Sequence, residues 1–336
     1  MPFDRDRMSA RAGELAARGV YVGTSSWKYE GWINQLYTPE RYAYRGGLAR
    51  SRFDRSCLGE YAQVFKTVCV DAAYYAFPGR TFLQRMADQA PEDFLFGLKV
   101  TDTITIKKFP NLERFGDRAG KANDQFLDAD LFAKAFLEPC EAIRPKVGLL
   151  IFEFSRFWPT DYGRGRDFLA DLDMFLGRLP GGWPYGVELR NSNWLHRDYF
   201  ECLSRRRVAH VFNSWGAMPP VGEQLSLPQS RTHAELVGAR FLLTPGRRYE
   251  EAVQRFQPYD KIKEVNEEAR AAGAALISEG AKTPGRKTFI YVNNRLEGNA
   301  LETLDAMVGL ARIPHDGEDD NEIRALPSTP LERGPR

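Results

Sequence analysis

Short runs of β-branched and aromatic residues recur along the chain, and the spacing between them leaves room for helices. Each run is apolar over most of its length, which is typical of a parallel strand covered on both faces. Eight strands are predicted, at Val20–Ser25, Phe65–Asp71, Phe94–Val100, Val147–Phe152, Tyr185–Leu189, Val208–Phe212, Ala239–Leu243 and Thr288–Asn293.

The intervening segments have a helical apolar period, most clearly between Asn123 and Arg144. Helices are predicted near Leu48–Ala62, Thr81–Gln89, Asp124–Ile143, Gly165–Leu179, Arg197–Arg206 and Tyr259–Ala272. Eight strands alternating with helices predict an α/β fold, a TIM-like (β/α)8 barrel over residues 20–313, with a doubly wound open sheet as the alternative.

We expect this barrel to be a single domain with long βα loops, at Arg41–Gly47 and Thr103–Lys121. Residues 1–19 form an N-terminal extension. Residues 314–336 are rich in charge and proline, so we expect a flexible tail whose acidic run is a solvated cluster rather than a binding segment.

Composition narrows the class of protein. The 336 residues include 47 Lys and Arg against 45 Asp and Glu, which argues against a polyanion binder that works through overall charge. The four cysteines are too sparse for a disulfide scaffold and lack zinc-site spacing. We find no signal peptide and no run long enough to span a bilayer, so we expect a cytoplasmic protein without membrane contact.

Familiar catalytic motifs are missing from the sequence. The stretch Gly280–Thr288 resembles a phosphate-binding loop, but an arginine interrupts it and it precedes a strand. The four histidines do not fall at predicted strand ends, and His210 is interpreted as a core residue. No organic cofactor is indicated and no metal ligand is assigned, although a divalent metal bridging Asp71, Glu153 and Glu188 stays open.

Polar residues gather where the predicted strands end. In a barrel these C-terminal ends converge on one opening, so the residues there are site candidates. Side chains alternate between the two faces of a strand, so Glu188 and Arg190 share one face. By the same alternation, Asp71 and Glu153 each lie at the end of an otherwise apolar strand face. We assign Glu188, Lys99 and Asp71 as catalytic candidates. The ligand-binding candidates are Ser25, Trp27, Trp32, Tyr74, Tyr75, Glu153, Arg190, Asn213, Asn293 and Asn294.

Two interpretations of the charged residues remain. Lys99 and Arg190 are natural counter-charges for the acids, because an unpaired buried carboxylate is costly. The set therefore forms either a polar pocket for a ligand or an ion-pair network that closes the barrel. The aromatic residues Trp27, Trp32, Tyr74 and Tyr75 either form a stacking wall or pack the loops.

Several motifs resemble the YecE-like family, domain of unknown function 72. They are Gly23-Thr-Ser-Ser-Trp27-Lys-Tyr29-Glu-Gly-Trp32, the segment Phe65–Tyr75, Phe94–Lys99, Gly148–Glu153, Gly186-Val-Glu188-Leu-Arg190-Asn-Ser-Asn-Trp194 and Tyr291–Ala300. The resemblance spans roughly residues 20–310 and implies a TIM-like barrel, without an established activity. Cys69, Asp71, Glu153, Asn191 and Thr244 depart from the family's usual residues.

Two hypotheses follow for function. The first is an enzyme-like pocket for a small phosphate- or carboxylate-bearing ligand, with Glu188 as acid or base, Lys99 and Arg190 stabilising negative charge, and Asn293 and Asn294 orienting the ligand. The second is a non-catalytic binding module, possibly for single-stranded nucleic acid. The sequence leaves the substrate, the presence of catalysis and the oligomeric state open.

Overall fold

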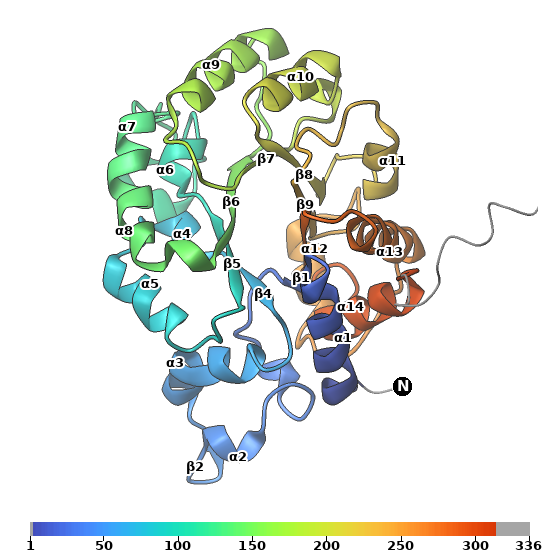
Figure 1. Ribbon diagram of the computed structural model, residues 1–336. Coiled ribbons are helices and arrows are strands. Elements are labelled where there is room, and N and C mark those ends of the chain that lie inside the picture. The colour runs from blue at the N-terminus through green and yellow to red at the C-terminus, as the bar shows by residue number, and fades with distance from the viewer. Residues whose placement is uncertain (1–2, 314–336) are drawn as a thin grey trace, which may run out of the picture.

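The computed structural model describes residues 3–313 and shows a closed barrel of eight parallel strands ringed by helices (Figure 1). The order around the barrel is β1-β10-β9-β8-β7-β6-β5-β4, so the open-sheet alternative is wrong. The strands are β1 (Val20–Thr24), β4 (Thr67–Val70), β5 (Leu95–Lys99), β6 (Val147–Phe154), β7 (Tyr185–Leu189), β8 (Ala209–Ser214), β9 (Leu236–Phe241) and β10 (Lys287–Val292). All eight predicted strands are therefore present, with ends shifted by at most a few residues.

Helices and short turns fill the connections between the strands. The longer helices are α1 (Arg5–Ala17), α3 (Arg50–Tyr61), α5 (Arg80–Ala87), α9 (Gly165–Arg178), α10 (Arg197–Arg205), α12 (Tyr249–Phe256), α13 (Glu267–Ala281) and α14 (Ala300–Leu310). The shorter ones are α2 (Pro39–Tyr42), α4 (Ala72–Tyr75), α6 (Asp102–Thr105), α7 (Ala129–Phe132), α8 (Glu138–Cys140) and α11 (Val221–Ser226). A small hairpin, β2 (Ala43–Tyr44) and β3 (Gly47–Leu48), occupies the first predicted loop.

Two predicted helices are placed differently by the structure. The helix expected over Tyr259–Ala272 is wrong: α12 ends before Pro258, and α13 begins after Asn266, whose side chain accepts the Ala269 amide at 3.0 Å. The helix expected over Asp124–Ile143 begins only at Ala129 and widens into a π-helical segment, Ala133–Leu137, just before Pro139. Proline lacks the amide that a regular helix needs there.

The N-terminal extension is a helix that packs on the barrel. Asp4 caps α1, and Met8, Ala12 and Leu15 form its buried face. Arg7 reaches Asp305 of α14 at 2.6 Å, which ties the two ends of the described chain together. The predicted tail, residues 314–336, lies outside the described residues.

The barrel interior follows the alternation expected from the sequence. Cys69, Leu149, Ile151, Val211 and Tyr291 belong to one buried cluster on the inner face. Gly97 makes room in this layer, because a β-carbon there would overlap the Tyr291 ring. His210 points the other way and is buried beside Tyr199 and Phe212, as the core interpretation predicts. Burial lowers its pKa to about 3.

Candidate functional site

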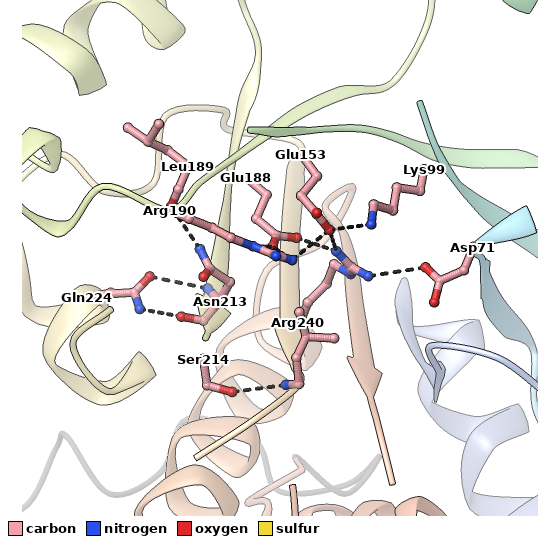
Figure 2. A network of polar contacts seen from close by, with 11 residues as sticks. Asp71, Lys99, Glu153, Glu188, Leu189, Arg190, Asn213, Ser214, Gln224 and Arg240 are labelled. Carbon is pink, nitrogen blue, oxygen red and sulfur yellow. Dashed lines mark hydrogen bonds and ion pairs between the residues drawn. The ribbon is translucent and has the colours of Figure 1, made fainter. Parts of the chain in front are cut away.

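Six charged side chains meet at the opening formed by the C-terminal ends of the strands, and we call them the mouth network (Figure 2). They project from β4, β5, β6, β7 and β9 or from the residue that directly follows the strand. Its members are Asp71, Lys99, Glu153, Glu188, Arg190 and Arg240. Parallel strands bring these distant segments to one edge, which confirms that the predicted carboxylates and their counter-charges lie together.

The two glutamates carry most of the contacts. Glu188 accepts from Arg190 Nε at 2.9 Å on Oε1 and from Arg240 Nη1 at 2.6 Å on Oε2. A single oxygen of Glu153, Oε2, lies 2.7 Å from each of three cationic nitrogens. These belong to Lys99 Nζ, Arg190 Nη2 and Arg240 Nη1. Asp71 makes a weaker contact, 3.3 Å to Arg240 Nη2.

Charge in the network balances, with three acids against three bases. Glu188, Glu153 and Arg240 are at most 2% exposed, so each depends on its partners for compensation. Burial alone would raise the pKa of Glu153, but Arg190, Lys99 and Arg240 outweigh it and hold that pKa well below its ordinary value. Burial lowers and the carboxylates raise the pKa of Arg240, and the net effect is a rise. Glu153 and Arg240 are therefore both ionised at neutral pH.

Arg240 is the one member that the sequence reasoning missed. The predicted strand begins at Ala239, which makes Arg240 look like an ordinary residue near a strand start. In the barrel its register partners are Asn213 on β8 and Tyr291 on β10, and both face inward. The sequence does carry one signal for Arg240: it is a lone charged residue within an apolar strand, and such a residue needs a buried partner.

Two aromatic rings pack against two of the network cations. Lys99 Nζ lies 3.5 Å from the Tyr74 ring centroid, and Arg190 Cζ lies 4.1 Å from that of Trp215. Burial, followed by the charge of Glu153, raises the pKa of Tyr74, so its phenol stays protonated. Cation–π contact stabilises both cations where the carboxylates do not reach them.

Buried polar atoms without a hydrogen-bond partner in the described structure lie at the same end of the barrel as the network. They include Ser25 Oγ, Asn213 Oδ1 and Arg240 Nε. Each residue is at most 2% exposed; Asn213 and Arg240 are register partners on β8 and β9, and Ser25 directly follows β1. Such atoms cost about 1–3 kcal/mol each unless a water or ligand satisfies them.

The two asparagines after β10 are committed mainly to their own loop. Asn293 Oδ1 accepts the Arg295 amide at 3.0 Å, and Asn294 Oδ1 accepts the Ala300 amide at 2.7 Å, at the start of α14. Asn294 Nδ2 has no partner among the described residues. Only this amide nitrogen of Asn294 remains for the ligand contact predicted for it.

The structure distinguishes between the two interpretations of the four aromatic residues, a stacking wall or loop packing, through the burial of each ring. Trp32 is fully buried and packs against Tyr29 and Tyr37, because the chain after β1 folds back over it. Trp27 is 7% exposed and Tyr74 is 5% exposed, whereas Tyr75 is 64% exposed at the rim. The packing interpretation therefore holds for the two tryptophans, and Tyr75 alone of the four presents its ring to solvent.

Replacing Trp32 with alanine is expected to lower the free energy of unfolding by about 3–5 kcal/mol, because it empties a fully buried site. Replacing Tyr75 with alanine is expected to change it by less than about 0.5 kcal/mol, because that ring is exposed. Urea unfolding followed by circular dichroism measures both. A small loss for Trp32→Ala would contradict a structural role for this residue.

The metal hypothesis does not fit the geometry of the carboxylates. Arg240 donates to Glu153, Glu188 and Asp71 at once, so a guanidinium already lies between the groups that were expected to bridge a metal ion. Among residues 3–313, no group of three or more metal-ligating side chains is assembled for an ion. The three carboxylates at the barrel mouth are therefore engaged by a guanidinium instead of being free to bridge an ion.

The closed parallel barrel with polar side chains at its C-terminal opening defines a TIM-like (β/α)8 barrel protein. The chain belongs to the family described as "Protein of unknown function DUF72", whose model matches residues 21–328. This confirms the resemblance found in the motifs.

Relatives and solved structures agree with this family. UPF0759 protein YecE of Escherichia coli O157:H7 is 22% identical over 65% of this chain and 64% of its own length. YecE of E. coli strain K12 is 24% identical over 52% and 50%. The matched region thus spans between half and two thirds of the length of each of these curated relatives.

Two solved DUF72 structures share the fold. A protein from Enterococcus faecalis V583 has a TM-score of 0.60 at 18% identity, covering 88% of this chain and 97% of that one. A protein from Thermotoga maritima MSB8 has a TM-score of 0.54 at 20% identity, covering 85% and 98%. Within the described chain, no helix is long and apolar enough to cross a membrane.

The departures from the family pattern have defined places in the structure. Cys69 lies inside the barrel, and burial raises its pKa to about 12, so it remains a thiol. Asp71, two residues further, reaches the network instead. Asn191 holds the loop after β6 by accepting the Phe157 amide at 2.9 Å and donating to the Phe157 carbonyl at 3.0 Å.

Proposed function

We propose that the barrel mouth binds a small anionic ligand bearing a phosphate or carboxylate group. The observation that carries this proposal is the set of buried unpaired atoms, Ser25 Oγ, Asn213 Oδ1 and Arg240 Nε, at the end of the barrel that holds the mouth network. A bound polar molecule would satisfy donors and acceptors that the protein itself leaves open.

The charge at the rim favours an anion. The six network charges cancel, and Arg295 adds a positive charge that no described ion pair neutralises. Its guanidinium lies 4.7 Å from the Tyr249 ring, and its Nε is buried without a partner in the described structure. An arginine with free donors is the group that recognises phosphate and carboxylate oxygens best.

Among the three catalytic candidates, the contacts assign different roles. Both oxygens of Glu188 are occupied by arginines, so we assign it to holding Arg190 and Arg240 in place. The Asp71 side chain is 32% exposed and makes one weak contact, so we assign it to proton exchange with the ligand. Lys99 retains donor capacity, because Glu153 is the only carboxylate that it contacts within the described structure.

The test is titration calorimetry with inorganic phosphate, 2-phosphoglycolate and citrate. Wild-type protein is expected to bind at least one probe, and Ser25→Ala and Arg295→Gln are each expected to weaken binding about tenfold, the loss of one good hydrogen bond to a charged group. Arg205→Gln is the matched control, because Arg205 is 63% exposed and lies at the end of α10, before β8 begins.

Failure of all three probes at millimolar concentration would contradict an anion site, and so would equal affinity in wild type and both mouth variants. Mass spectrometry of the native protein would show whether an anion co-purifies. Residence in the cytoplasm also remains a proposal, and it rests on the four cysteines, which are all buried free thiols.

A further inference from the structure

A groove separate from the mouth network lies between the loop after α6 and the loop after β6. It has a volume of about 350 Å³, within the range of small-ligand sites. Its buried wall includes Thr105, Ile106, Phe109 and Phe157, and its exposed edge carries Lys108, Arg156 and Trp158. None of the mouth network residues lines this groove, which we call the Trp158 groove.

Trp158 presents a large aromatic surface at the edge of the groove. Its side chain is 57% exposed, and Arg156 Cζ lies 4.6 Å from its ring centroid. The Trp158 amide donates to Asp161 Oδ2 at 2.8 Å, which fixes the loop that carries the ring. More than half of the Trp158 side chain faces solvent, and a flat ligand can stack on such an exposed ring.

The groove is positively charged. Three cations, Lys107, Lys108 and Arg156, line it against one acid, Asp161. None of the three cations forms an ion pair with any described carboxylate. Lys107 instead lies 3.3 Å from the centroid of the Tyr162 ring. Phosphate oxygens are the natural partners of unpaired cations beside a stacking surface.

A buried hydroxyl gives an independent sign of a ligand. Thr105 lines the groove and is 1% exposed, and its Oγ1 has no hydrogen-bond partner among residues 3–313. From the groove, the open aromatic face, the unpaired cations and this hydroxyl together, we infer that the Trp158 groove binds a nucleotide. The base stacks on Trp158, the phosphate contacts Lys108 and Arg156, and a polar group of the ligand pairs with Thr105.

The same chemistry belongs to a free mononucleotide and to a nucleotide within a single strand, and two probes separate these sources. Fluorescence anisotropy with labelled oligo(dT) of ten nucleotides tests the strand, and calorimetry with UMP and AMP tests the free nucleotide. Binding of either probe that Trp158→Ala weakens supports the inference and identifies the source, whereas binding that this variant leaves unchanged belongs to another site. With Lys108 and Arg156 engaged, strand affinity is expected to fall about sevenfold between 50 and 200 mM salt.

Three variants localise the binding. Trp158→Ala and the double variant Lys108→Gln/Arg156→Gln are each expected to weaken binding at least about tenfold, and Trp158→Phe is expected to retain most of it. Arg144→Gln is the matched control: Arg144 also stacks on a tryptophan, at 4.5 Å from Trp183, but precedes β6 at the opposite end of the barrel.

The inference is overturned if neither probe binds, or if binding is unchanged by Trp158→Ala and by the double variant. Because Trp158, Lys108 and Arg156 are exposed, thermal unfolding of these variants is expected to match wild type. The two sites are told apart by the variants, because Arg295 does not line the Trp158 groove and Trp158 is not part of the mouth network.

Discussion

Replacing Arg240 with methionine is expected to lower the free energy of unfolding by about 3–5 kcal/mol, because it leaves buried carboxylates without the counter-charge that they share. Arg240 is 2% exposed and its guanidinium donates to Glu153, Glu188 and Asp71. Methionine keeps similar bulk and removes the charge, so the network is left with three acids and two bases. Urea unfolding at pH 7 measures the change.

A second substitution separates charge imbalance from loss of packing. The double variant Arg240→Met/Glu188→Gln restores equal numbers of acids and bases in the mouth network. It is therefore expected to be more stable than the sum of the two single losses predicts, by at least about 1 kcal/mol of coupling. Simple additivity, or a loss below about 1 kcal/mol for Arg240→Met, would show that the network does not depend on this guanidinium.

Replacing Glu153 with glutamine is expected to lower the free energy of unfolding by about 3 kcal/mol at pH 7 and by less in acid. Its neighbours hold the pKa of Glu153 in the folded protein below the ordinary value of about 4.3. A lowered folded-state pKa stabilises the protein above the unfolded-state pKa. This stabilisation is lost as the pH falls through the window between the two values.

The difference between wild type and Glu153→Gln should therefore be constant from about pH 7 to 5 and shrink progressively below about pH 4. Urea midpoints across this range give the curve. Glu141→Gln is the control. Glu141 forms an exposed pair with Arg144 at 2.8 Å, so this variant is expected to show the same dependence of stability on pH below pH 5 as wild type. If the stability difference between the two proteins stays the same down to pH 3, the neighbours of Glu153 do not lower its pKa in the folded protein.

The mouth network joins the two interpretations that the sequence left open. It is an ion-pair network, with every acid contacting at least one cation. It also leaves neighbouring polar atoms unpaired within the described structure, among them Ser25 Oγ and Asn213 Oδ1. We therefore regard the charges as the scaffold of the proposed site and the unpaired atoms as its contact surface.

The amino-acid sequence alone determined the strand pattern, and with it the barrel and the side of each strand that faces inward. Those properties are local: a strand alternates every second residue, so Glu188 and Arg190, or Cys69 and Asp71, must share a face. Parallel strands then bring their ends to one rim, which is why Asp71, Lys99, Glu153 and Glu188 could be grouped without coordinates.

Only the tertiary structure decided which partner each charge takes and which aromatic rings remain in solvent. Arg240 joins the network because barrel closure sets β9 between β8 and β10, a relation that spacing along the chain does not contain. Trp32 and Trp158 have the same side chain, yet one is fully buried and the other is 57% exposed. Burial depends on how loops far apart in sequence pack over each ring, so it is fixed by the assembled fold.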